Sequence, residues 1–94
     1  MAERRSKQQI IYDILFLIRK KGNKVKPTHI LYGGNLSYNR MVLYLNELEE
    51  KGLIEKFSEK KKKTMKQFYR LTEKGFQFLT QIDEIREIED AFGT

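Results

Sequence analysis

The first strongly periodic segment of the chain covers residues 6–21. Its apolar side chains recur at positions 10, 11, 14, 15, 17 and 18, a spacing that is typical of an α-helix. Three basic residues fill the last turn, where positive charge favours the helix dipole, and Gly22 follows as a natural stop. The pattern predicts a helix here, with Tyr12 and Phe16 as an aromatic pair one turn apart.

Two further helical segments follow, joined by a tight turn. Residues 26–32 contain the only proline of the chain, Pro27, which suits the first position of a helix, and two glycines come after them. Ser37 is a natural N-cap for a longer helix over residues 38–51, which another glycine ends. The sequence therefore predicts a short helix, a turn and a longer helix.

The pattern then changes to that of β-strands. Residues 53–57 and 67–71 have the apolar and aromatic enrichment of strands, and EKKKKTMK lies between them. We expect a loop of about eight residues there, mobile when nothing is bound, because that length is long for a hairpin and its lysines repel one another. Thr72 caps a last helix, which runs from Glu73 to about Phe92.

The predicted order of elements is α-α-α-β-β-α, mainly α with one β-hairpin. A short turn before the third helix and a basic segment between the strands are the plan of a winged helix-turn-helix domain. We assign residues 1–72 to such a domain. Residues 73–94 form a C-terminal helix for dimerisation, packed on the same domain.

Charge divides the chain at the same point. Residues 1–72 hold 17 Lys and Arg against 7 Asp and Glu, a net charge of +10, whereas residues 73–94 hold 2 against 6, a net charge of −4. A basic domain implies a partner with dense negative charge, and an acidic tail implies exclusion from that partner. The alternative is that the lysine run is only a solvent-exposed charged surface that keeps the protein soluble and binds no ligand.

Three stretches carry a resemblance to a known family. PTHILYGGNLSY, YLNELEEKGLI and FYRLTEKGFQFL resemble the small archaeal winged-helix DNA-binding proteins, similar to MarR-like and ArsR-like domains, whose last helix pairs two subunits through a coiled coil. The resemblance covers roughly residues 6–92. It implies binding of double-stranded DNA by a homodimer with an antiparallel helix pair, although a last helix of about 20 residues is short for that family.

The helix over residues 38–51 would read DNA bases, because the second helix of such a motif lies in the major groove. With Leu45 at the centre of its buried face, the outward residues are Arg40, Leu43 and Glu47, flanked by Asn39 and Asn46. Arginine suits guanine, asparagine suits adenine and leucine can meet a thymine methyl group. Arg40 and Asn39 could equally contact a phosphate.

Phosphate contacts are expected from helix N-termini and from lysines. Thr28, Ser37 and Tyr38 lie at two N-termini, where exposed N–H groups bind anions; the alternatives are plain capping or, for Tyr38, packing. The resemblance implies that this region touches the DNA backbone. His29 is a surface residue that could face DNA. The lysine-rich segment would release counterions from the duplex through Lys60, Lys61, Lys62 and Lys63.

The last helix has two apolar faces at its start. Phe76 and Leu79 would fill the core of the domain, while Gly75 lets the backbone approach the strands. A second stripe extends beyond what so small a domain can cover, and a second copy related by a two-fold axis would bury it. We place in this dimer interface Tyr12, Phe16, Phe78, Ile82, Ile85, Ile88 and Phe92.

The residue inventory does not favour an enzyme. The chain has one histidine, no cysteine and no Gly-rich phosphate loop, so we expect no catalysis, no metal and no cofactor, and we infer no small-molecule effector. No apolar run approaches the roughly 20 residues of a membrane span, and no secretory signal is visible. We expect a cytoplasmic, nucleoid-associated regulator or chromatin protein. The alternative is an interaction module for an acidic protein, and RNA binding is a lesser option.

Overall fold

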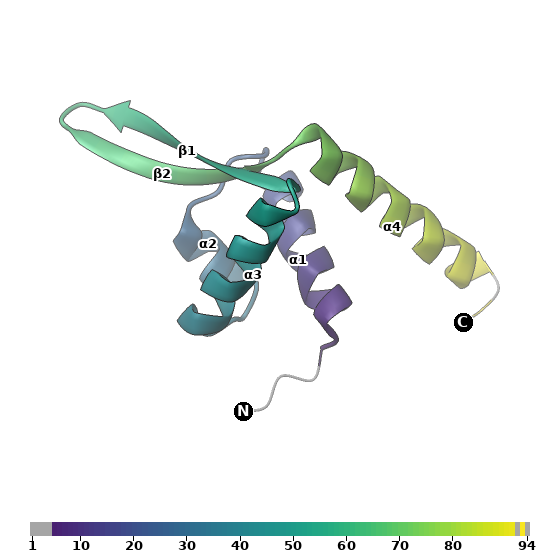
Figure 1. Ribbon diagram of the computed structural model, residues 1–94. Coiled ribbons are helices and arrows are strands. Elements are labelled where there is room, and N and C mark those ends of the chain that lie inside the picture. The colour runs from purple at the N-terminus through teal and green to yellow at the C-terminus, as the bar shows by residue number, and fades with distance from the viewer. Residues whose placement is uncertain (1–4, 92, 94) are drawn as a thin grey trace.

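The computed structural model describes residues 5–91 and 93. Three helices pack beneath a hairpin that projects to one side, while the last helix leaves the domain on the other side (Figure 1). The predicted order of elements is confirmed, and the fold is mainly helical with one antiparallel hairpin. The elements are α1 (Lys7–Lys20), α2 (Pro27–Gly33), α3 (Tyr38–Glu50), β1 (Ile54–Lys61), β2 (Thr64–Leu71) and α4 (Glu73–Ala91).

Local capping explains where the helices begin. The Oγ of Ser6 accepts a hydrogen bond from the Gln9 backbone N at 3.0 Å, which satisfies an N–H that has no partner inside α1. Thr72 caps α4 in the same way, because its Oγ1 accepts from the Gly75 backbone N at 3.0 Å. Pro27 occupies the first position of α2, as predicted.

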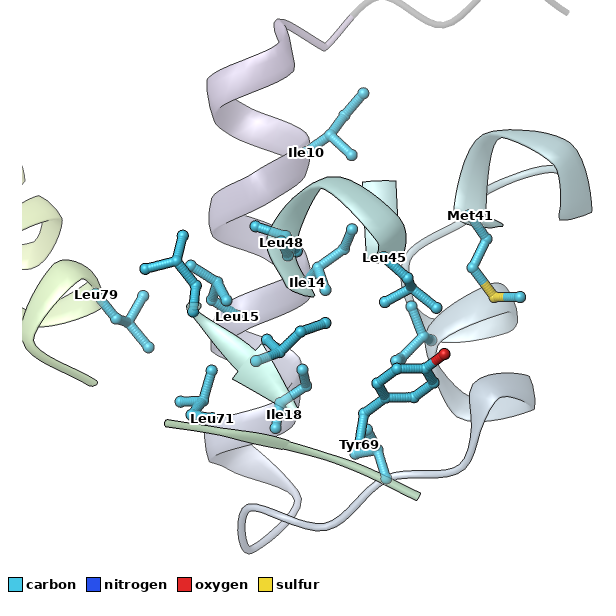
Figure 2. Packing of buried hydrophobic residues seen from close by; sticks show 14 of the residues in the cluster. Ile10, Ile14, Leu15, Ile18, Met41, Leu45, Leu48, Tyr69, Leu71 and Leu79 are labelled. Atoms are coloured by element: carbon cyan, nitrogen blue, oxygen red, sulfur yellow. The ribbon is translucent and has the colours of Figure 1, made fainter. Parts of the chain in front are cut away.

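One apolar core joins all the elements. The buried side chains of α1 point toward those of α3, and Tyr69 and Leu71 of β2 close the same cluster (Figure 2). Each large aliphatic side chain in such a core contributes roughly 1.5 to 3 kcal/mol relative to its exposed state. The cluster draws on α1 for Ile10, Ile14, Leu15 and Ile18, and on α3 for Met41, Leu45 and Leu48.

The hairpin corrects the expected loop. β1 and β2 stay paired out to Lys61 and Thr64, so only Lys62 and Lys63 form the turn and the prediction of an eight-residue mobile loop was wrong. Pairing is compatible with the charge because successive side chains of a strand point to opposite faces, which separates neighbouring lysines. Lys62 adopts φ of 56°, a left-handed conformation that a tight turn requires.

α4 approaches the domain closely at its start. A Cβ on Gly75 would lie 2.0 Å from the Leu53 carbonyl oxygen, which confirms the predicted close approach. Leu79 is fully buried, also as predicted, but Phe76 is 37% exposed and does not fill the core. The buried residues of α4 are Gly75 and Leu79, so the contact between this helix and the domain is narrow, and Phe76 lies at the edge of that contact. Phe92 lies outside the described residues.

Candidate nucleic-acid interface

α3 presents the outward face that its periodicity predicts. Its apolar side faces the core, and Leu43 on the opposite side is 69% exposed. The Oγ of Ser37 accepts a hydrogen bond from the Arg40 backbone N at 3.3 Å, so Ser37 is the N-cap that begins this helix. The exposed residues of its first turns are Tyr38, Asn39, Arg40 and Leu43.

Arg40 is held along the helix by an aromatic neighbour. Its guanidinium carbon lies 5.9 Å from the ring centroid of Tyr44, and Tyr44 itself packs against the core. A cation–π contact at an exposed site stabilises by about 0.5 to 1 kcal/mol. Within residues 5–91 the guanidinium has no acidic partner, so its donors are available to an external acceptor.

Glu47 is an acid on this face, and two lysines hold it. Its Oε1 lies 3.0 Å from the Lys7 Nζ and its Oε2 lies 3.3 Å from the Lys51 Nζ. The hydrogen bond from Lys7 is the largest of several causes that lower the pKa of the Glu47 carboxyl. The ion pair between Glu47 and Lys51 could be predicted from their i,i+4 spacing. No sequence pattern links Lys7 to Glu47, because the first turn of α1 meets α3 only in the folded domain.

These side chains border a hollow beside α3. Its volume is about 270 Å³, and its lining comes from α3 and from the first turn of α1. Positive, apolar and negative groups therefore meet around one hollow on the outward side of α3. The lining residues are Lys7, Arg40, Leu43, Tyr44 and Glu47.

The lysines of the hairpin lie at its far end. Lys60 and Lys61 belong to β1, where they face Met65 and Thr64 across the ladder, and the next two lysines form the turn. All four are exposed, and none of them is ion-paired within the described part of the chain. The acids of the hairpin lie nearer its base and are already paired, Glu55 with Arg70 and Glu59 with Lys24.

The remaining predicted contacts are split between two places. Thr28 and His29 line a separate hollow of about 350 Å³ between α1 and α2, together with two exposed lysines of the α1 end. The Nδ1 of His29 accepts from the Lys26 backbone N at 3.3 Å, so the ring also completes the start of α2. Tyr38 is exposed beside Ser37 at the start of α3, which excludes the packing alternative.

A polar network joins α4 to α1. Asp83 accepts hydrogen bonds at 3.0 Å from the Tyr12 hydroxyl and from the Arg19 guanidinium. The Arg86 guanidinium lies 3.8 Å from the centroid of the Tyr12 ring and donates to the Gln9 side chain at 2.7 Å. Burial, followed by the bond to Asp83, raises the pKa of Tyr12. This network fixes the direction in which α4 leaves the domain.

Beyond the network, α4 leaves apolar side chains uncovered. Ile85 and Ile88 are 56% and 59% exposed, and Phe78 is also exposed. Phe16 is exposed as well, with its ring stacked on Tyr12 at 5.8 Å. A groove of about 340 Å³ between α1 and α4 passes Tyr12, Phe78, Ile82 and Ile85.

Metal chemistry finds no support in the described part of the chain. There, no three histidine, aspartate or glutamate side chains gather closely enough to hold a metal ion. Within the same residues, no helix combines the length and the apolar character that crossing a bilayer requires.

The arrangement of three helices, a hairpin and a last helix has counterparts among known proteins. Residues 4–90 match the family model described as winged helix-turn-helix. The chain belongs to this family. An uncharacterized protein of Methanocaldococcus jannaschii is 33% identical over 85 residues, which span 90% of this chain and 77% of that protein.

Solved structures of winged-helix proteins superpose on nearly the whole chain. Sso10a-2 from Sulfolobus solfataricus, described as a DNA-binding protein, has a TM-score of 0.69 and 27% identity, covering 94% of this chain and 85% of that one. AF1382 from Archaeoglobus fulgidus has a TM-score of 0.67 and 23% identity, and the match covers 89% of this chain and 90% of AF1382. The hairpin is thus the wing of the winged helix, α3 is the second helix of its helix-turn-helix, and the archaeal resemblance is confirmed.

Proposed function

We propose that this winged-helix protein binds double-stranded DNA through α3 and the wing, as a transcriptional regulator or chromatin-associated protein. The observation that carries the proposal is the end of the wing, where four exposed lysines form no ion pair with any acid of the described residues, since the nearest acid, Glu59, pairs with Lys24. Unpaired like charges repel one another, and a polyphosphate relieves that repulsion while releasing its own counterions. Membership of the winged helix-turn-helix family and the likeness to a protein described as DNA-binding support the same conclusion.

Most of the binding energy would come from phosphates. Lysine is a compact point charge, which favours backbone contact over the paired hydrogen bonds that read a base. The four wing lysines would grip the backbone beside the groove that α3 enters. Further backbone contacts would come from Thr28, His29, Ser37 and Tyr38, whose positions flank the two helices of the motif.

Base contacts would come from the first turns of α3. Arg40 has its donors available, and Asn39 lies beside it with an amide that suits adenine. Leu43, on the same outward face, can meet a thymine methyl group.

The protein would act as a homodimer, and α4 would supply the interface. Its exposed apolar stripe continues over the groove toward α1, so a second copy can bury Phe16, Phe78, Ile82, Ile85 and Ile88 at one contact. The net charge of −4 over residues 73–94 keeps this surface away from DNA. Two domains joined in this way would present two α3 helices to one duplex.

Fluorescence anisotropy with a random-sequence duplex at several salt concentrations tests the proposal. We expect log K to fall with log salt at about −0.9 per neutralised phosphate, and replacement of Lys60 to Lys63 by alanine to reduce the slope by up to about 3.6. Lys74→Ala on α4 is the control for the loss of a surface charge. A slope near zero in the intact protein refutes DNA binding. The alternative would then be that the wing binds an acidic protein partner.

A further inference from the structure

An acid on a surface that meets phosphates needs a physical explanation. Glu47 lies on the outward face of α3, two helical turns from Arg40, and within the described part of the chain no other carboxylate borders the hollow there. An unpaired carboxylate at this place would repel the duplex. Lys7 and Lys51 cancel that repulsion, because together with Glu47 they leave a local charge of about +1 while holding both carboxylate oxygens.

The two lysines leave the carboxylate able to accept more hydrogen bonds. Each ionised oxygen has two acceptor sites, and Lys7 and Lys51 occupy one on each. The Glu47 side chain remains 28% exposed, so an external donor can reach it. In the major groove the base-edge donors are the amino groups of cytosine and adenine, and the adenine group lies next to the acceptor N7, which disfavours a carboxylate.

The distance between Arg40 and Glu47 along α3 predicts how far apart the two recognised base pairs lie. Seven residues separate Arg40 from Glu47, about 10 Å along a helix that turns nearly back to the same face. Successive base pairs rise by about 3.4 Å, so the two side chains lie about three base pairs apart on the duplex. Leu43 lies between them on the same face.

We propose that Glu47 is a specificity-determining residue that selects cytosine about three base pairs from the guanine read by Arg40. Lys7 and Lys51 are positioning residues that hold its carboxylate toward the base edges. The inference rests on the proposed DNA binding through α3. It adds recognition of cytosine, whose amino group needs a hydrogen-bond acceptor that the wing lysines lack.

Selection from a library of random duplexes tests this reading. The wild-type protein is expected to enrich a guanine and, about three positions away, a cytosine preferred about tenfold over other bases. Glu47→Gln is expected to keep the guanine and to exchange cytosine for adenine, because an amide pairs with the N6 and N7 edge of adenine. Arg40→Ala is expected to lose the guanine and keep the cytosine.

Glu50→Gln on the same helix is the matched control, since it removes the same charge one turn nearer the C-terminal end of α3. It raises overall affinity slightly and leaves the selected pattern unchanged. The inference is overturned if the wild type binds tightly but enriches no pattern, or if Glu47→Gln selects the same bases as the wild type. A wild type that binds no duplex refutes the proposed function itself, and this inference with it.

Discussion

Replacing Gly75 by alanine tests how α4 is joined to the domain. In an exposed helix this change stabilises by about 1 kcal/mol, because alanine is the better helix former. Here the added Cβ would lie 2.0 Å from the Leu53 carbonyl oxygen, whereas Cβ contacts do not fall below 3.0 Å. The start of α4 must therefore move away from Leu53 by about 1 Å.

The expected cost follows from what that movement disturbs. Overpacking a tight contact costs about 1 to 3 kcal/mol. The same Leu53 oxygen accepts a hydrogen bond from the Thr72 backbone N at 3.1 Å, which is worth about 1 kcal/mol. After subtraction of the gain in helix propensity, Gly75→Ala should destabilise the protein by about 1 to 3 kcal/mol.

Urea unfolding followed by circular dichroism measures this loss. At about 1 kcal/mol per molar urea the midpoint should fall by about 1 to 3 M. The protein concentration must stay fixed, since dimerisation would make the midpoint concentration-dependent. Gln77→Ala, on the exposed side of the same turn, is the control and should change the midpoint little. An unchanged or raised midpoint for Gly75→Ala would show that α4 is not held where we place it.

Three further changes separate the roles of the surfaces. Tyr12→Phe should cost about 0.5 to 1.5 kcal/mol by removing the bond to Asp83. Because the folded pKa of Tyr12 is raised, its contribution is complete below pH 10 and is lost as pH rises through that pKa, so Tyr12→Phe should flatten the alkaline fall in stability, measured by urea unfolding across pH. Lys62→Gly should leave thermal stability nearly unchanged, because glycine suits the left-handed turn, yet reduce the salt slope by about 0.9; an unchanged slope would mean that this lysine meets no phosphate. Ile85→Glu should give a folded monomer by analytical ultracentrifugation, whereas Thr80→Glu should not; a dimeric Ile85→Glu protein would place the interface elsewhere.

The helices could be predicted closely because their signals are local. The N-caps Ser37 and Thr72, Pro27 in the short helix and the apolar periodicity predict each helix to within about one residue of the observed ends. The outward face of α3 is equally local, since rotation by 100° per residue decides which side chains oppose Leu45.

The hairpin shows where local reasoning fails. A run of lysines reads as a loop when each residue is judged alone, but pairing depends on the partner strand, which supplies the ladder out to Thr64. The same limit applies to Phe76, because the width of the contact between α4 and the domain is a property of two surfaces.

The sequence by itself determined the order of elements, the basic charge of residues 1–72, the acidic charge of residues 73–94 and the outward face of α3. These features depend on residues that are close together along the chain. Only the tertiary structure brought Lys7 to Glu47 and Asp83 to Tyr12 and Arg19. Those pairs join residues far apart in sequence, and their formation depends on how helices pack around a shared core, which no short-range pattern encodes.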